Sequence, residues 1–150
     1  MKSTADMFLL MRGMGKVHEA ALEKPRREYS LSQIEVKIIS FLSNNPDKDT
    51  AAEISYIRML PKGNVSQAID ALIKKGLVKK RADEKDKRKY HLYLTENSFE
   101  IVDTIKNVNE GFLQTIYKGL SNEEMETYMS INEKIFNNVL QELEGKNERQ

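Results

Sequence analysis

The basic side chains of this chain are concentrated in its middle part, where they are suited to contact a polyanion. Residues 61–94 carry ten Lys or Arg and four Asp or Glu, whereas residues 95–150 carry five and eleven. The net charge of the whole chain is only +1, so the distribution is more informative than the total. It predicts one face for a polyanion and another face for a different partner.

Small polar side chains precede the basic run at helical spacing. Val65, Ile69 and Leu72 predict the buried stripe of a helix whose opposite face is polar. Amide and hydroxyl groups on such a face can pair with base edges in a major groove. The predicted contacts to bases or phosphates are Asn64, Ser66 and Gln67, and those to phosphate alone are Lys62 and Lys74. The alternative for each is an ordinary solvated helix face.

Residues for catalysis or metal binding are scarce. The chain has no cysteine, which excludes disulfides, thiolate metal sites and cysteine nucleophiles. Its two histidines are His18 and His91, and His18-Glu19 begins like a zinc-protease motif but lacks the second histidine, because Leu22 stands in its place. We therefore expect no enzyme, no cofactor and no metal site. No apolar run approaches the roughly 20 residues of a membrane span, and we expect a cytoplasmic protein without membrane contact.

Capping patterns place the helices that present the polar face. Ser32-x-x-Glu35 and Thr50-x-x-Glu53 have the form of capping boxes and predict helices that begin near residues 33 and 51. The second must stop before Pro61, and the polar-faced helix then runs to a C-terminal cap at Gly76. Two short helices joined by a tight turn are the helix-turn-helix pattern.

A hairpin follows these helices. Residues 77–81 form a short apolar-to-basic run, and Tyr90, Leu92 and Leu94 alternate with polar residues at the period of a strand. The segment between them is long and basic. Helices and hairpin in this order predict a winged helix with residues 30–95 as its lobe.

Long amphipathic helices are predicted at both ends of the chain. One runs to about Leu22, one from a cap at Thr95 to about Lys118, and one follows a third capping box at Ser121. A winged helix is too small to cover their apolar stripes, so we predict that residues 1–29 and 96–145 form a helical lobe that dimerises with a second copy. The alternative is an intramolecular bundle folded back on the winged helix.

The run from Leu72 to Thr95 resembles the MarR family of winged-helix transcriptional regulators. It reads LIKKGLVKKRADEKDKRKYHLYLT and is similar to the family pattern L-x-x-K-G-L-V, then D-x-x-D-x-R, then L-T, without a gap. The resemblance extends over nearly the whole chain. The sequence differs from the family pattern near Met59, where the family usually has a glycine. It implies a single domain, mainly α with a small β-hairpin wing, comprising a winged helix-turn-helix and long terminal dimerisation helices.

The resemblance also implies a function. We expect a homodimeric, sequence-specific regulator of transcription that binds double-stranded DNA, a ligand-responsive repressor on an inverted-repeat operator. Asp86 and Arg88 resemble the pair that braces the family's wing. Basic wing residues suit a minor groove or phosphates, with a solvated loop as the alternative. The predicted wing contacts are Lys85, Lys87 and Arg88.

The sequence leaves the effector and the overall function with two interpretations each. A small-molecule effector of the family's kind would bind between the dimer helices and the winged helix, where the candidate residues are Met7, Phe8, Met11, Met14 and His18. Methionine adapts to varied ligands, but the same residues also suit a plain dimer core, which is the interpretation we prefer. The alternative function for the whole chain is a winged-helix protein-interaction module without sequence-specific DNA binding.

Overall fold

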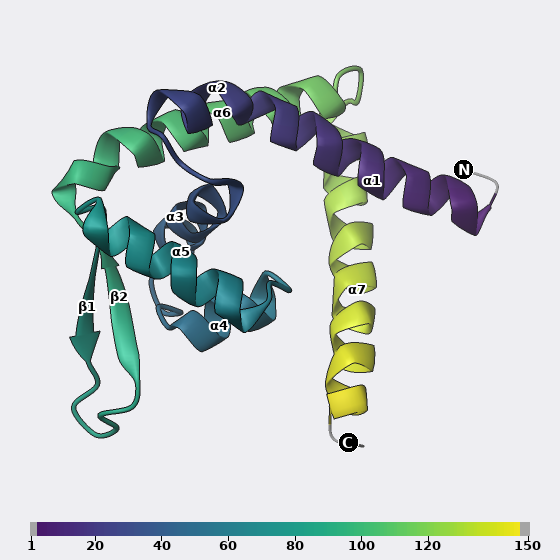
Figure 1. The fold of residues 1–150 in the computed structure, drawn as a ribbon. Coiled ribbons are helices and arrows are strands. Elements are labelled where there is room, and N and C mark those ends of the chain that lie inside the picture. The colour runs from purple at the N-terminus through teal and green to yellow at the C-terminus, as the bar shows by residue number, and fades with distance from the viewer. Residues whose placement is uncertain (1–2, 148–150) are drawn as a thin grey trace. The chain divides into compact units, whose positions relative to one another are not determined.

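The computed structural model describes residues 3–147 and is mainly helical (Figure 1). Its contacts divide the chain into two compact units that meet between Phe112 and Leu113. The helices of the first unit are α1 (Thr4–Ala21), α2 (Glu23–Glu28), α3 (Gln33–Asn44), α4 (Ala51–Ile57), α5 (Lys62–Lys74) and most of α6 (Phe99–Ile116). Its hairpin consists of β1 (Val78–Ala82) and β2 (Tyr90–Leu94), and a 3-10 turn, η1 (Glu96–Ser98), precedes α6.

The first unit contains the winged helix that the sequence predicts. α3, α4 and α5 gather around one core, and the antiparallel hairpin leaves the end of α5 with Val78 opposite Leu94. Phe41, Ile38, Ile54 and Leu72 are fully buried there. Burying side chains of this size stabilises a fold by about 1.5–3 kcal/mol each. The orientation of α5, which carries the candidate site, is fixed by this packing.

Three of the predicted capping sites have the expected hydrogen bonds. Ser32 and Thr50 form complete capping boxes with Glu35 and Glu53, and Ser121 accepts from the backbone N–H of Glu124 at the start of α7 (Asn122–Asn147). Gly76 has a φ of 70° just after α5, the left-handed conformation expected of a helix-ending glycine. The helix starts are therefore set by short-range patterns.

Thr95 does not have the predicted capping role. Its hydroxyl donates to the Gly76 carbonyl at 2.6 Å, and no side-chain cap is made to η1, which separates Thr95 from α6. α6 consequently begins later than predicted and ends at Ile116. Its buried stripe starts at Ile101, whereas Phe99 is 56% exposed.

The turn between α4 and α5 is closed by a buried serine. Ser55 Oγ donates to the Leu60 carbonyl at 2.7 Å, and the Leu60 N–H donates to the Ser55 carbonyl at 3.0 Å. Met59 between them has a φ of 50°, a conformation that favours glycine. A helix-turn-helix turn is thus formed here with methionine at the left-handed position.

Lys75 ties the end of α5 to the beginning of α3. Its Nζ donates to Glu35 Oε1 at 2.8 Å, to Glu35 Oε2 at 3.0 Å and to the Ser30 carbonyl at 2.7 Å. Burial by itself would raise the pKa of Glu35, but Lys75 and the Ser32 N–H together lower it. The Glu35 side chain is only 4% exposed, so a buried, ionised carboxylate joins the two helices.

The second unit contains the end of α6 and α7. Tyr117 and Tyr128 pack with ring centroids 5.3 Å apart around the bend at Gly119, whose φ is 91°. Farther along α7, large apolar side chains are about half exposed: Met129, Ile131, Ile135, Phe136 and Val139. None of the described helices combines the length and apolarity needed to cross a bilayer.

Candidate nucleic-acid interface

α5 presents the predicted polar face to solvent. Val65, Ile69 and Leu72 are buried against α3 and α4, as predicted, and they turn the opposite side of the helix outward. The exposed residues of that side are Lys62, Asn64, Ser66, Gln67, Asp70 and Lys74. All five predicted contacts on α5 are therefore accessible to a ligand.

An open groove of about 460 Å³ lies between α5 and the hairpin. Ser66 and Asp70 line it from α5, and Lys80, Asp86 and Arg88 line it from the hairpin. Further lining residues are Thr50, Ala51, Ala52, Ile69, Lys89, Tyr90 and Leu92. Ser66 and Arg88, which are 22 positions apart, are thereby brought to one surface.

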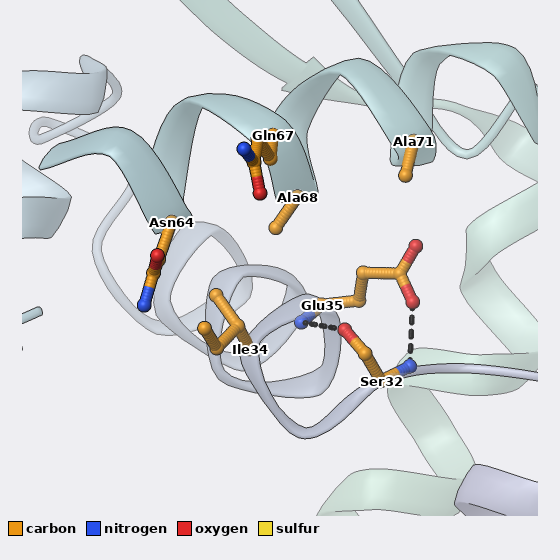
Figure 2. Close-up of a pocket in the computed structure, with 7 residues that line it drawn as sticks. All are labelled: Ser32, Ile34, Glu35, Asn64, Gln67, Ala68 and Ala71. Atoms are coloured by element: carbon orange, nitrogen blue, oxygen red, sulfur yellow. Dashed lines mark hydrogen bonds between the residues drawn. The ribbon is translucent and has the colours of Figure 1, made fainter. Parts of the chain in front are cut away.

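Asn64 and Gln67 belong to a different part of the α5 surface. With Ala71 they border a second open groove of about 270 Å³, whose opposite wall is Ile34 and Ser32 at the start of α3 (Figure 2). The candidate base contacts are therefore divided between two flanks of α5. Lys62 and Lys74 lie at its two ends and line neither groove.

Two aspartates shape the tip of the wing, residues 83–89. Asp83 Oδ1 accepts the backbone N–H groups of Lys85 and Asp86, both at 2.8 Å. Asp86 Oδ1 accepts the N–H of Arg88 at 3.0 Å. The predicted contact between Asp86 and Arg88 thus exists at the Arg88 backbone, while the Arg88 side chain lines the first groove.

Cations also extend along the strands. The Lys80 ammonium lies 5.3 Å from the centroid of the Tyr90 ring, and the Arg81 guanidinium lies 5.9 Å from that of Tyr93. Cation–π contacts of this kind hold a basic side chain against the sheet without neutralising it. The strands therefore add positive charge to that of Lys85, Lys87 and Arg88, all exposed at the tip.

Three residues that sequence reasoning did not select hold the wing against the rest of the unit. His91 on β2 contacts Asp49 through Nδ1 at 2.6 Å and Asp83 through Nε2 at 2.9 Å. Asp83 was visible as the first residue of the D-x-x-D-x-R pattern. Asp49 lies 42 positions before His91, and only the folded chain brings them together.

Among the predicted effector residues on α1, His18 has defined side-chain partners. His18 Nε2 lies 2.7 Å from Asn109 Oδ1, and its ring packs on Phe112 with centroids 4.9 Å apart. A cavity of about 20 Å³ beside His18 has room for about one water. Met7 and Met14 are half-buried, whereas Phe8 and Met11 are 54% exposed. Within residues 3–147, no cluster of His, Asp or Glu is arranged to hold a metal ion.

The sequence of this surface matches a known family. Residues 29–89 match the model of the MarR family. YkoM, an HTH-type transcriptional regulator of Bacillus subtilis strain 168, is 28% identical over 101 residues, which are 67% of this chain and 64% of that protein. The chain thus aligns with less than two thirds of this relative's length. The resemblance predicted from residues 72–95 is confirmed.

Solved structures share the fold. A MarR transcriptional regulator from Methanosarcina mazei Go1 superimposes with a TM-score of 0.79 and 20% sequence identity. The superposition covers 92% of this chain and 99% of that protein's chain. MepR of S. aureus, in a complex with DNA, has a TM-score of 0.72 and 18% identity, covering 91% and 96%. The predicted fold, a winged helix-turn-helix with long terminal helices, is confirmed.

Proposed function

We propose that this chain, whose residues 29–89 match the MarR family model, is a dimeric, sequence-specific DNA-binding regulator of transcription of that family. The observation that carries the proposal is the exposed polar face of α5 beside a basic wing, with Ser66 and Arg88 on one groove. Polar side chains of this kind read base edges in the major groove, and wing cations suit the minor groove and phosphates. A structure of the same fold, MepR of S. aureus, is solved in a complex with DNA, which supports DNA as the ligand.

Dimerisation is the second part of the proposal. α1 exposes Phe8, Leu9 and Leu10 by half or more of their surfaces, and α7 exposes a comparable apolar set. Contiguous apolar faces on long helices are typical of interfaces, and a second copy of the same chain offers faces of matching character. Two recognition helices related by a two-fold axis would read an inverted repeat, with half-sites about 10 base pairs apart.

The test is binding to duplex DNA. Random duplexes should bind with an affinity that falls steeply with salt, because phosphate contacts release counterions. Selection from a random pool should then return sites with dyad symmetry. Weak binding at every salt concentration would favour a winged-helix protein-interaction module instead, and selected sites without symmetry would contradict the dimeric arrangement.

A repressor that responds to an effector is the most specific part of the proposal. The residues that would line an effector cleft are Met7, Phe8, Met11, Met14 and His18. Methionine side chains and a histidine suit an aromatic or anionic small molecule. The measurement is release of the selected operator by a panel of aromatic carboxylates. Loss of release in a Met11→Ala variant with unchanged dimerisation would support the cleft, whereas unchanged release would place the effector elsewhere.

A further inference from the structure

The ring of His91 is held between two carboxylates. Nδ1 lies 2.6 Å from Asp49 Oδ1, and Nε2 lies 2.9 Å from Asp83 Oδ2. A neutral imidazole donates from one nitrogen only, whereas two carboxylate partners need a donor at each nitrogen. The geometry therefore favours the imidazolium. All three side chains are about one-quarter exposed, so they lie at the edge of the hairpin and are not deeply buried.

The three residues come from different parts of the fold. Asp49 precedes α4, the first helix of the helix-turn-helix, and its carbonyl also accepts the N–H of Leu92 on β2 at 2.8 Å. Asp83 follows β1, and its second oxygen accepts the N–H groups of Lys85 and Asp86 at the tip. Hydrogen bonds therefore run from the start of α4, through His91, to the basic tip of the wing.

We propose that Asp49, His91 and Asp83 form a clamp that positions the wing tip relative to α4 and α5. His91 is a positioning residue, since it acts on DNA only through the residues that it holds. The consequence for DNA affinity rests on the proposed function. The clamp itself is a property of the folded chain and can be measured without DNA.

The charges around His91 favour its protonated form, which the clamp requires. Asp83 and then Asp49 raise the pKa of His91, since both accept from its ring, and His91 in turn keeps the pKa of Asp83 well below its usual range. Arg81 faces His91 across the hairpin, but its guanidinium lies over the Tyr93 ring. The clamp is complete below pH 6.5, the ordinary value of His91, as long as both aspartates are ionised, and it is lost as the pH rises through the raised pKa of His91.

The other carboxylates on the helices packed against β2 are already engaged. On α4, Glu53 is held by the hydroxyl and N–H of Thr50, and its charge is further balanced by Lys48 and Lys89. On α3, Glu35 is paired with Lys75. Asp49 and Asp83 are therefore the carboxylates that control the protonation of His91.

The experiment compares Asp49→Asn with Asp47→Asn. Both variants remove one negative charge from the same exposed loop, but only the first reaches His91. Among the described residues, no hydrogen bond or ion pair joins either position directly to the backbone of Lys85 or Asp86, so we expect a change at those amides to be transmitted through His91. The readouts on the full chain, by NMR, are the heteronuclear NOE of the Lys85 and Asp86 amides and the titration of the His91 ring.

We expect Asp49→Asn to lower both NOE values and to shift the His91 titration toward 6.5, its ordinary value, with Asp47→Asn matching the parent. His91→Gln should lower the same NOE values, because its amide cannot donate to two carboxylates from opposite sides. Identical tip dynamics in the parent, Asp49→Asn and His91→Gln would overturn the clamp. Circular dichroism at equal protein concentration checks that each variant keeps its helices.

The functional measurement uses random duplex DNA at one salt concentration. Asp49→Asn should bind several-fold more weakly than the parent at pH 6.5 although it is less acidic, and the difference should shrink by pH 9. Asp47→Asn should bind as the parent does or slightly more tightly at both values. Altered tip dynamics with unaltered DNA affinity would overturn the link to binding. A parent that binds no DNA would contradict the proposed function alone, since the NMR readouts still decide the clamp.

Discussion

At the scale of single residues, Lys75 is the cation on which a buried carboxylate depends. Removing one member of a buried ion pair leaves the other charge without compensation, which costs up to about 3–5 kcal/mol in full burial. Lys75 is 35% exposed, so water retains part of the screening. The Glu35 carboxylate is nevertheless almost completely enclosed, and after a loss of Lys75 it would keep its capping hydrogen bond from the Ser32 N–H but no cation.

Lys75→Met should therefore lower the free energy of unfolding by about 1–3 kcal/mol at pH 7. Because the folded-state pKa of Glu35 is lowered, its stabilising effect is present above pH 4.5 and is lost as the pH falls through the folded-state value. The deficit should thus shrink below pH 4.5. Urea unfolding at fixed protein concentration measures it, and Lys74→Met, on the exposed neighbour, should stay within about 0.5 kcal/mol of the parent.

Substitutions of Gln67 and of the tip lysines should affect DNA binding in different ways. Gln67→Ala should keep the salt slope of DNA binding and lose about 1–3 kcal/mol of discrimination at particular base pairs. Changing Lys85 and Lys87 to Ala should weaken specific and random DNA alike and reduce the slope by about one for each lost contact. Salt series on the selected operator and on random DNA separate the two. A Gln67→Ala variant with unaltered base preferences would contradict base reading by this flank of α5.

At the scale of elements, local patterns predicted the helix starts and long-range contacts decided the exceptions. Ser32, Thr50 and Ser121 cap the helices they precede, because the capping partner lies three residues away. Thr95 has the same type of side chain, but Gly76 is placed beside it by the hairpin and takes its hydroxyl. The sequence immediately around Thr95 cannot show that the Gly76 carbonyl, 19 positions earlier, will accept its hydroxyl.

In the candidate site, too, some features follow from the local sequence and others depend on the folded chain. The exposed face of α5 follows from the spacing of Val65, Ile69 and Leu72, so its residues could be named in advance. The separation of Ser66 from Gln67 into two grooves depends on which elements flank α5, and the contact between His91 and Asp49 depends on the path of the whole lobe. These features required the folded chain.

The geometry of the wing predicts additive roles for Asp86 and Arg88. Asp86 accepts a backbone N–H of Arg88, a contact that Arg88→Ala preserves, while the Arg88 side chain faces the first groove. In a double-mutant cycle on DNA affinity, Asp86→Ala and Arg88→Ala should therefore couple by less than about 0.5 kcal/mol. A coupling of 1 kcal/mol or more would favour a side-chain brace between the two residues.

At the scale of the whole molecule, the apolar face of α7 predicts how the chain assembles. A charge at Val139, buried in a dimer interface, should cost several kcal/mol. Val139→Asp should sediment as a monomer at micromolar concentration and lose tight binding to an inverted repeat, since assembly and affinity are linked. Asn137→Asp adds the same charge to a polar position of α7 and should remain dimeric. A dimeric Val139→Asp variant with parental affinity would place the interface elsewhere.

The tip of the wing has a practical consequence for any experiment that handles this protein. Residues 83–89 contain Lys85, Lys87, Arg88 and Lys89, all exposed, in a turn that projects from a two-stranded hairpin (Figure 1). Exposed loop tips are preferred sites of proteolysis, and trypsin cleaves after Lys and Arg. Limited digestion should therefore cleave the chain there first. A DNA duplex bound over the wing should slow this cleavage. The rate of cleavage within residues 83–89 would then report how much of the protein has DNA bound.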